Sequence, residues 1–291
     1  MTASASTPPD GGLTILDPDQ TDLLRELDNA ITGWAGVAGA REIIAPPVYP
    51  VRDLEKFDVY KNFPQLQFVG GPLDVAGAPP LPENGAFSPG DVEPPVLGLP
   101  HATCYGAYLY FENKAVAPDT TVTLLNRCFR NEEKYEGLRR LLSFQMREIV
   151  AVGSSEHAQD VLARFTRCVN RFATELDLDL TKVAATDPFF EQDGGRALLQ
   201  RLSPVKHEFQ ADDLAIASVN THRNFFGERC GITIEGTGQH AYTACVAFGL
   251  ERWLAVLTER FHGDLAAARI AVRAAGTAVK PSGPASDTPA A

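Results

Sequence analysis

The stretch FRNEEKYEGLRRLLSFQMREIVAV at residues 129–152 concentrates the residue types that bind a nucleotide. A guanidinium fork matches a phosphate, a carboxylate accepts a hydrogen bond from an amine, and an aromatic face stacks on a purine. These groups are supplied by Arg130, Glu132, Arg140 and Phe144. The same residues could form surface ion pairs on an ordinary amphipathic hairpin, and their spacing alone favours that interpretation.

Apolar residues flank these charges on both sides and predict a β-hairpin. The leading flank contains Leu124, Leu125, Cys128 and Phe129, and the returning flank contains Phe144, Met146, Ile149 and Val150. Both flanks have the apolar content of half-buried strands. We therefore expect a first strand that carries Arg130 and Glu132, and then a charged loop. The returning strand would carry Arg140, Phe144 and Glu148, and charges that interrupt such strands must be paired or face a ligand.

Two motifs in this order carry a family resemblance. Phe-Arg-x-Glu, a loop, and then Arg-xxx-Phe-xxx-Glu, at residues 129–148, resemble the second signature motif of class II aminoacyl-tRNA synthetases. ACVAFGLERWLAVL, at 244–257, resembles their third motif, in which Arg252 follows Gly-Leu-Glu. Further segments of the same kind are DVYKNFPQ (58–65), MREIV (146–150), ATDPFF (185–190) and LAIASVNTHRNFFGE (214–228). Together they resemble the bacterial amino acid:[carrier protein] ligases, homologues of atypical methanogen seryl-tRNA synthetases that lack a tRNA-binding domain.

The resemblance implies a zinc site. In that family a zinc ion is held by a Cys before the second motif, a Glu that closes it and a Cys that opens the third, which correspond here to Cys104, Glu148 and Cys245. Three ligands with a fourth place open describe a catalytic zinc, and the open place suits an amino group. From chemistry alone the metal signal is weak, because zinc ligands usually come in local pairs. A lone Cys in an aromatic, strand-like run such as the one around Cys104 is more often a buried small hydrophobe.

The resemblance also implies how ATP is bound. Arg130 is expected to contact the α-phosphate and the substrate carboxylate, and Arg252 the γ-phosphate. Phe144 is expected to stack on adenine with Glu132 near its amino group, and Arg140 completes the ATP contacts. The reaction is in-line attack of a carboxylate on the α-phosphorus, which arginines and Mg²⁺ assist by charge neutralisation and alignment.

Two details of the nucleotide site differ from the family or stay open. Ala247 stands where relatives often have the first Gly of the third motif, and its methyl group could crowd the nucleotide. The acidic ligand of Mg²⁺ is not evident, and Asp212 and Asp213 are the nearby candidates.

Two further sets of residues have weaker signals. Five residues in segments typical of the family are candidates for the amino-acid pocket, namely Lys206, His207, Asn220, His222 and Glu228. Either histidine alone is more often a satisfied core residue. A helix is expected after Ser154 or Ser155, with Arg164, Arg167 and Arg171 on one face. Such a face is usually only solvated, but it could dock an acidic carrier protein.

Composition limits the partners and the location. The chain has 291 residues, is 44% hydrophobic and carries a formal charge of −11 from 26 basic and 37 acidic residues. This sign is wrong for a protein that grips a polyanion along its length, so a tRNA is not expected as the main partner. No run is long enough to span a membrane, and five scattered Cys without a CxxC pair indicate reduced thiols.

The ends and the first third of the chain set the expected organisation. Residues 1–12 lack the features of a secretory signal and suggest a flexible leader in a cytoplasmic protein. We expect residues 13–276 to form the catalytic domain and residues 277–291 to form a disordered tail. Residues 17–34 have helical apolar spacing. In the strand-like REIIAPPVYP that follows, Pro46 and Pro47 are typical of a sheet edge or an interface. By resemblance this is the first motif, which implies a homodimer. Residues 70–100, rich in Pro and Gly, predict a surface loop or lid.

These observations predict an α+β fold, with an antiparallel sheet that carries the nucleotide and helices on its flank. The implied function is ATP-dependent activation of a small amino acid and its transfer to the 4′-phosphopantetheine thiol of an acyl or peptidyl carrier protein. Two alternatives stay open. The adenylate could pass to another acceptor, such as a small-molecule amine or a tRNA, or the chain could be an inactive regulatory paralogue. Neither the amino acid nor the carrier follows from the sequence.

Overall fold

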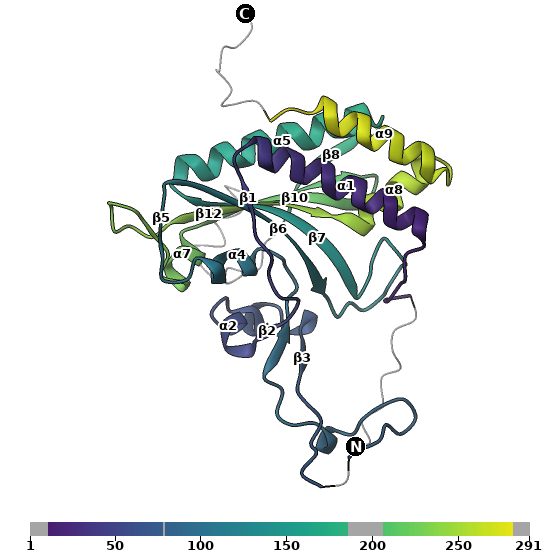
Figure 1. The fold of residues 1–291 in the computed structure, drawn as a ribbon, viewed down its shortest axis with the longest axis vertical. Helices are drawn as coiled ribbons and strands as arrows, with labels where there is room; N and C mark the ends of the chain where they lie inside the picture. Colours follow the sequence, from purple (N-terminus) through teal and green to yellow (C-terminus); the bar gives the residue numbers. More distant parts are fainter. Residues whose placement is uncertain (1–10, 78, 186–205, 282–291) are drawn as a thin grey trace, which may run out of the picture.

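A large sheet contains the strands that build the site (Figure 1). In the computed structural model, which describes residues 11–77, 79–185 and 206–281, its order is β1-β6-β7-β12-β10-β9-β8. The bounds are β1 Arg41–Glu42, β6 Asp119–Phe129, β7 Ser143–Gly153, β12 Tyr242–Gly249, β10 Leu214–Arg223, β9 Lys206–Ala211 and β8 Leu180–Ala185. β1 pairs with β6 in parallel, and the other neighbours are antiparallel. The expected α+β class with a mainly antiparallel sheet is confirmed.

Long helices cover one face of this sheet (Figure 1). They are α1 Pro18–Val37, α5 Ser155–Glu175, α8 Leu250–Arg260 and α9 Leu265–Ala278. Asp17 starts α1 with a capping box to Gln20, and the Ser154 side chain accepts from the His157 backbone N–H at the start of α5. Both helices expected from apolar spacing are therefore confirmed. Their apolar sides form one core with the sheet, in which Phe172 and Trp253 are almost fully buried.

Shorter elements cover the other face. They are α2 Val51–Glu55, α3 Val59–Asn62, α4 Tyr105–Tyr110, α7 Phe225–Arg229, the 3-10 helix Pro64–Leu66 and two small sheets. A further 3-10 helix, Pro89–Asp91, lies farther from the large sheet (Figure 1). One small sheet has the order β2-β4-β3, from Tyr49–Pro50, Leu97–Leu99 and Phe68–Gly70, and the other pairs β5 Ala115–Val116 with β11 Thr233–Ile234. A second core forms here around the packed rings of Phe57, Tyr105, Tyr108 and Phe226.

Two local expectations were wrong. β6 ends at Phe129 and β7 begins at Ser143, so Arg130, Glu132 and Arg140 lie in the loop between the strands. The apolar residues that hold a strand in the sheet stop at Phe129, and the charged residues have no core to enter. The run after Cys104 is helix α4 and not a strand, because the Cys104 carbonyl accepts from backbone N–H groups three and four residues ahead.

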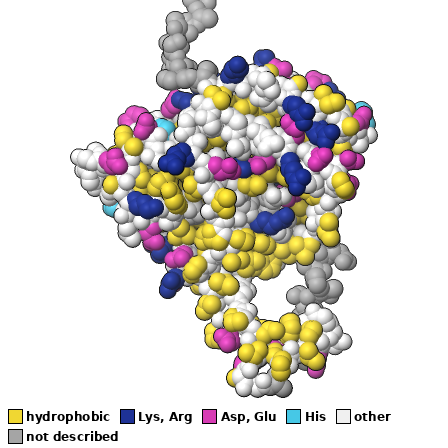
Figure 2. Space-filling model, in the orientation of Figure 1, with side chains coloured by type: hydrophobic (Ala, Val, Ile, Leu, Met, Phe, Trp, Pro, Cys, Tyr) yellow, Lys and Arg dark blue, Asp and Glu magenta, His cyan; other side chains and the backbone are white. Residues whose placement is uncertain are grey.

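The segment between β3 and β4 projects from the body as an irregular extension, as its Pro and Gly content predicts (Figure 1). Exposed hydrophobic side chains gather on it in Figure 2, and they include Leu73, Val75, Leu81 and Phe87. In the first-motif stretch, β1 is an edge strand of the large sheet, and the prolines between β1 and β2 are exposed. The expected edge position is confirmed, and dimerisation stays a prediction.

The ends of the described chain bear on the expected domain bounds. α9 continues to Ala278 and Val279 is buried, so ordered structure extends beyond residue 276. Most of the expected leader and tail, and all of ATDPFF after Ala185, lie outside the described residues. Within the described ranges, the chain has no helix with the length and apolarity needed to cross a bilayer.

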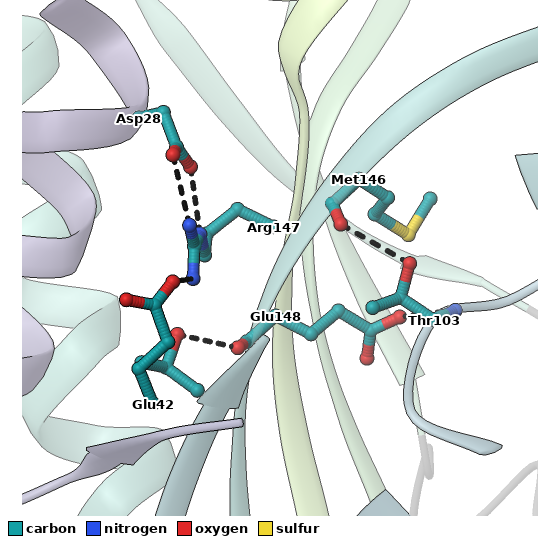
Figure 3. Close-up of polar contacts among 7 residues, drawn as sticks. Asp28, Glu42, Thr103, Met146, Arg147 and Glu148 are labelled. Atoms are coloured by element: carbon teal, nitrogen blue, oxygen red, sulfur yellow. Dashed lines mark hydrogen bonds and ion pairs between the residues drawn. The ribbon is translucent and has the colours of Figure 1, made fainter. Parts of the chain in front are cut away.

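A buried arginine joins the helix layer to the sheet (Figure 3). Arg147 of β7 is 3% exposed and donates from Nε and Nη2 to the Asp28 carboxylate of α1, at 2.6 and 2.8 Å. Its Nη1 donates to Glu42 of β1 at 2.7 Å. These contacts fix the first-motif helix and strand against the hairpin strand that carries the site.

Asp28→Ala should lower the free energy of unfolding by about 3 kcal/mol, because it leaves a buried guanidinium without its bidentate partner. Glu42→Ala is the matched control, since the Glu42 side chain is 50% exposed and that of Asp28 only 17%. This control should lower the free energy of unfolding by less than about 1 kcal/mol. Urea unfolding of both variants measures the difference, and equal losses would contradict this role for Asp28.

Candidate active site

Strand alternation sends the neighbour of Arg147 to the opposite face of the sheet (Figure 3). There Glu148 meets Cys104, which immediately precedes α4, and Cys245 of β12. Cys245 pairs with Val150 and Ala247 with Glu148, so the register puts carboxylate and thiol on adjacent strands of one face. The three ligand atoms lie within 4.8 Å of one another, and each side chain is at most 4% exposed. The structure thus brings the three expected metal ligands together.

Thr103 holds the Cys104 segment against β7. Its hydroxyl donates to the Met146 carbonyl at 3.1 Å, and its backbone N–H donates to Glu148 Oε1 at 3.0 Å. The Cys104 N–H donates to the same oxygen at 3.2 Å. The second oxygen, Oε2, is buried and has no hydrogen-bond partner among the described residues. Since buried acceptors without a partner are rare, this oxygen has the property expected of a metal ligand.

Ionisation of any one of these three acidic groups makes ionisation of the other two less favourable, because all three side chains are buried together. Burial raises the pKa of Glu148, whereas the nearby Cys245 thiol and the backbone N–H groups of Thr103 and Cys104 act to lower it. The hydrogen bond with Cys104, together with burial, raises the pKa of Cys245 well above its usual value. For Cys104, the bond with Cys245 lowers the pKa, but burial and the Glu148 charge raise it overall. A divalent cation reverses this preference, and two sulfurs with one oxygen suit zinc, so the residues fit the implied ion.

Two adjoining hollows occupy this face of the sheet. The hollow that we call the metal hollow contains the three candidate ligands with Phe63, Leu66, His101, Asn220 and His222. The hollow that we call the nucleotide hollow is lined by the charged residues Arg130, Glu132, Arg139, Arg140, Lys206, Glu208, Glu251 and Arg252, and by Phe144. Five residues line both, namely Arg130, Met146, Lys206, Ser218 and Ala247. A molecule at this junction reaches the metal hollow and the nucleotide hollow together.

Two arginines give the nucleotide hollow a positive charge. Arg130 donates from Nε and Nη2 to the His101 carbonyl, both at 3.2 Å, and its guanidinium carbon lies 5.0 Å from the Phe144 ring centroid. Arg252 donates to the carbonyls of Arg139 and Ala215 at 3.0 and 2.9 Å. Burial, with help from neighbouring arginines, lowers the pKa of Arg252 to about 10. Among the described residues neither arginine forms an ion pair, so both can bind a polyphosphate.

The carboxylates of the nucleotide hollow are not those expected for Mg²⁺. Asp212 and Asp213 do not line it, and Asp213 pairs with Arg139 at 2.5 Å. Both lie in the turn between β9 and β10. Glu132, Glu208 and Glu251 line the hollow instead, and Glu132 pairs with Arg140 at 3.3 Å.

Glu251 and Glu208 differ in what holds them. Both oxygens of Glu251 accept from the Gln145 backbone N–H at 2.9 and 2.8 Å, which ties the start of α8 to β7. Glu208 pairs with Lys206 at 3.1 Å and faces Ser218 across the β9–β10 pairing. Among the three carboxylates that line this hollow, Glu208 is therefore the one whose ion-pair partner is a lysine.

The weaker candidates divide between the faces. Lys206, Asn220 and His222 line the metal hollow, whereas His207 and Glu228 line neither hollow. Arg164, Arg167 and Arg171 lie on α5, which covers the opposite face of the sheet. Arg164 pairs with Asp160 at 2.7 Å, and Arg171 pairs with Glu175. This face is therefore largely neutralised within its own helix.

Sequence reasoning missed His101. Its ring contacts the side-chain nitrogen of Gln67 and the hydroxyl of Tyr105, each at 2.9 Å, and its carbonyl holds Arg130. The available signal was its place three residues before Cys104 in the sequence HATC. It is buried, and burial, with the charges of Arg130 and Lys206, lowers its pKa to about 3.

Known proteins resemble this chain over most of its length. No family model matches the chain. It is 33% identical over 243 residues to amino acid–[acyl-carrier-protein] ligase 2 of Bradyrhizobium diazoefficiens, covering 78% of this chain and 72% of the relative. It is 32% identical to ligase 1 of that organism, covering 79% and 74%. A type-2 serine–tRNA ligase of Methanopyrus kandleri is 27% identical, covering 74% of this chain and 42% of the relative.

Solved structures agree with this fold. M. kandleri SerRS, in complex with A. aeolicus tRNASec, superposes with a TM-score of 0.73 at 19% identity, covering 97% of this chain and 60% of the other. The cytoplasmic serine–tRNA ligase of Naegleria fowleri, in complex with AMP, gives 0.67 at 13% identity, covering 93% and 61%. At these identities the likeness shows the class II synthetase fold alone.

The buried state of His101 predicts a pH dependence of stability. In the unfolded chain, His101 takes up a proton as the pH falls below its ordinary pKa of 6.5. In the folded protein the same ring stays neutral until about pH 3. Stability should therefore fall as the pH drops through this window, with a slope approaching about 1.4 kcal/mol per pH unit. Denaturant unfolding of wild type and His101→Gln at a series of pH values isolates this contribution. Parallel stability curves for the two proteins would contradict it.

Proposed function

The chain belongs to the family of amino acid–[acyl-carrier-protein] ligases, and we propose that it activates a small amino acid with ATP and transfers it to the 4′-phosphopantetheine thiol of a carrier protein. The observation that supports this most is the junction of the two hollows at Arg130 and Lys206. An amino acid at this point has its amino group in the metal hollow and its carboxylate beside the nucleotide. Activation of an amino acid requires that both its amino group and its carboxylate are held in place.

The first step joins the carboxylate to the nucleotide. A carboxylate oxygen attacks the α-phosphorus, a new O–P bond forms, and the bond to pyrophosphate breaks. Arg130 holds the α-phosphate and the carboxylate in line, Arg252 binds the terminal phosphate, and Phe144 offers its ring to adenine. The arginines are already held by backbone carbonyls, so little reorganisation is needed as charge develops on the phosphate.

The second step releases AMP. The thiolate of the carrier arm attacks the acyl carbon, a thioester forms, and the acyl–phosphate bond breaks. An acyl-adenylate is already activated, so the protein needs no nucleophile of its own. Its task is to hold the adenylate while the arm enters.

We assign zinc to Cys104, Glu148 and Cys245, which supply two sulfurs and one oxygen and leave a fourth place open. Bound there, zinc supplies a Lewis acid for a neutral amino group. The surrounding chain excludes water, since all three ligands are buried, and bulky neighbours such as Phe63 and His101 favour a small side chain. For the Mg²⁺ that accompanies ATP we propose Glu208 with the Ser218 hydroxyl, because Glu132 pairs with Arg140 and Glu251 accepts from the Gln145 backbone, whereas Glu208 pairs with a lysine.

Assembly, location and acceptor are proposed on separate grounds. A homodimer through the edge strand β1 is supported by the 95% exposure of nearby Ile44. A cytoplasmic location suits five buried free thiols. The charge of −11 favours a carrier protein over tRNA as acceptor.

We also propose that the carrier protein docks at Arg164, Arg167 and Arg171. Because α5 lies on the face opposite the hollows, a phosphopantetheine arm docked there would have to pass around the edge of the sheet. The alternative of an inactive paralogue is opposed by the retention of both hollow arginines and all three candidate ligands. Ala247 at the junction is the departure that favours the alternative.

Arg252→Lys should lower amino-acid-dependent exchange of pyrophosphate into ATP by about 100-fold, because a shorter point charge cannot keep the fork that meets the phosphate. Arg127→Lys is the control, since Arg127 is exposed and lines neither hollow. Exchange is measured over all common amino acids, and intact-mass analysis of a phosphopantetheinylated carrier then identifies the acceptor. Wild-type protein without exchange for any amino acid would exclude the enzyme and favour the paralogue.

Cys104→Ser, Glu148→Gln and Cys245→Ser should each lose tightly bound zinc, because two protein ligands hold the ion far less well than three. Cys128→Ser is a matched control: this thiol is also buried, and its Sγ lies 3.3 Å from the Thr103 hydroxyl. It should keep one zinc per chain. Metal analysis of purified, dialysed proteins measures the stoichiometry, and retention of zinc by all three ligand variants would refute the assignment.

A further inference from the structure

We propose that Tyr108, His222 and Asn220 form a hydrogen-bonded shell that stabilises Cys245 as a charged metal ligand. They are positioning residues, since they act through Cys245. The inference rests on the proposed zinc site and adds residues to which no metal role has been assigned. It also gives Asn220 a task other than contact with the substrate.

Two side chains of β10 reach the Cys245 sulfur. Asn220 Nδ2 donates to Sγ at 3.3 Å, and His222 Nε2 lies 3.9 Å from the same atom. Asn220 and Cys245 are register partners across β10 and β12, and His222 follows two residues along the same face. All three are buried, with exposures of 7%, 4% and 2%. Strand pairing therefore brings the Asn220 amide to the sulfur, and the register shift between Thr221 and Arg223 leaves a His222 ring nitrogen near the same atom.

Tyr108 is placed to set the tautomer of His222, because its hydroxyl faces the ring nitrogen Nδ1. Its hydroxyl lies 3.2 Å from His222 Nδ1, and the Thr243 hydroxyl lies 3.5 Å from the same nitrogen. When the Tyr108 hydroxyl donates to Nδ1, a neutral ring must carry its hydrogen on Nε2, the atom nearest the sulfur. The second nitrogen of a histidine beside a metal site commonly has this orienting task.

The surrounding rings keep this arrangement in place. Tyr108 stacks on Phe226 with centroids 4.0 Å apart and planes 15° apart, and His222 meets the same ring edge-on at 4.9 Å. Tyr108 and Phe226 are fully buried. A side chain packed in this way has few other rotamers, so the donor geometry does not depend on a flexible group.

Charge balance explains why a donor shell is needed. Two thiolates and a carboxylate around a divalent ion leave an excess of negative charge in a buried place, which is unfavourable unless hydrogen bonds compensate it. Glu148 receives two backbone N–H groups. Cys245 lies within a strand whose backbone is committed to ladder pairing, so its compensation must come from side chains.

The test compares zinc affinity, by chelator competition, in wild type and two variants of His222. His222→Leu removes the donor and should weaken zinc binding by about 10- to 100-fold. His222→Gln keeps an N–H near the position of Nε2 and should stay within about threefold of wild type. In the cobalt-substituted protein, the sulfur-to-metal absorption band should shift in His222→Leu and return in His222→Gln.

His157→Leu is the matched control. His157 is also a partly buried histidine with two contacts, to the Thr121 hydroxyl and the Thr120 carbonyl, but it lies on α5 across the sheet. Its zinc affinity and cobalt spectrum should equal those of wild type. Tyr108→Phe, which removes only a hydroxyl, provides a second test if His222→Leu does not fold, and should show the same band shift.

The outcomes separate the two proposals. Wild-type affinity and an unshifted band in His222→Leu, or in Tyr108→Phe where His222→Leu does not fold, would overturn the shell and leave the zinc site standing. Failure of His222→Gln to recover the band would show that packing, and not the N–H donor, matters, and would also overturn it. Absence of zinc and cobalt binding by wild type would overturn the metal centre itself, and with it this inference.

Discussion

The burial of two thiols and a carboxylate in one cluster is the constraint on which the rest of the site depends. Cys104, Glu148 and Cys245 come from three separate elements, and each is removed from water. Ionised groups in such a place are unfavourable unless a cation and hydrogen bonds compensate them. The chain supplies the hydrogen bonds through Thr103, Asn220 and His222, and the proposed zinc supplies the cation. Everything around the cluster either holds it in place or brings a substrate to it.

The sheet separates support from chemistry. Neighbouring residues of β7 point to opposite faces, with Arg147 bound to α1 and β1, and Glu148 in the cluster (Figure 3). Helices α1, α5 and α9 can therefore stabilise the sheet from the far side, whereas the start of α8 brings Glu251 and Arg252 into the nucleotide hollow (Figure 1). On the chemical face, strand register places Cys245 beside Glu148, and Asn220 beside Cys245. A shift of register by one residue would send these side chains to the helix layer.

Local physics explains what the sequence could predict. The caps and apolar spacing of α1 and α5 act over a few residues, so both helices could be read directly. Where Arg130 would lie depends on where the core ends, and the helix after Cys104 depends on tertiary packing of its aromatic rings. Apolar content alone gave strands in both places. Local patterns do not determine such features.

Distance in the sequence explains the rest. Residues 104, 148 and 245 meet only through strand pairing, and the family resemblance, not their spacing, identified them together. The roles of His101 and His222 depend on partners such as Tyr105 and Tyr108, and neither histidine has a local motif. The Mg²⁺ candidates have no local motif either: Asp213 pairs with Arg139 of the nucleotide hollow but does not itself line that hollow.

The most direct test of this account is anomalous diffraction at the zinc edge from crystals of the protein with a non-hydrolysable aminoacyl-adenylate analogue. The account predicts one zinc peak at bonding distance from Cys104, Glu148 and Cys245, with the amino group of the analogue at the fourth place and its phosphate on Arg130. A crystal with the analogue bound but no metal peak among these residues would contradict it. So would an ion at the site with the amino group directed elsewhere.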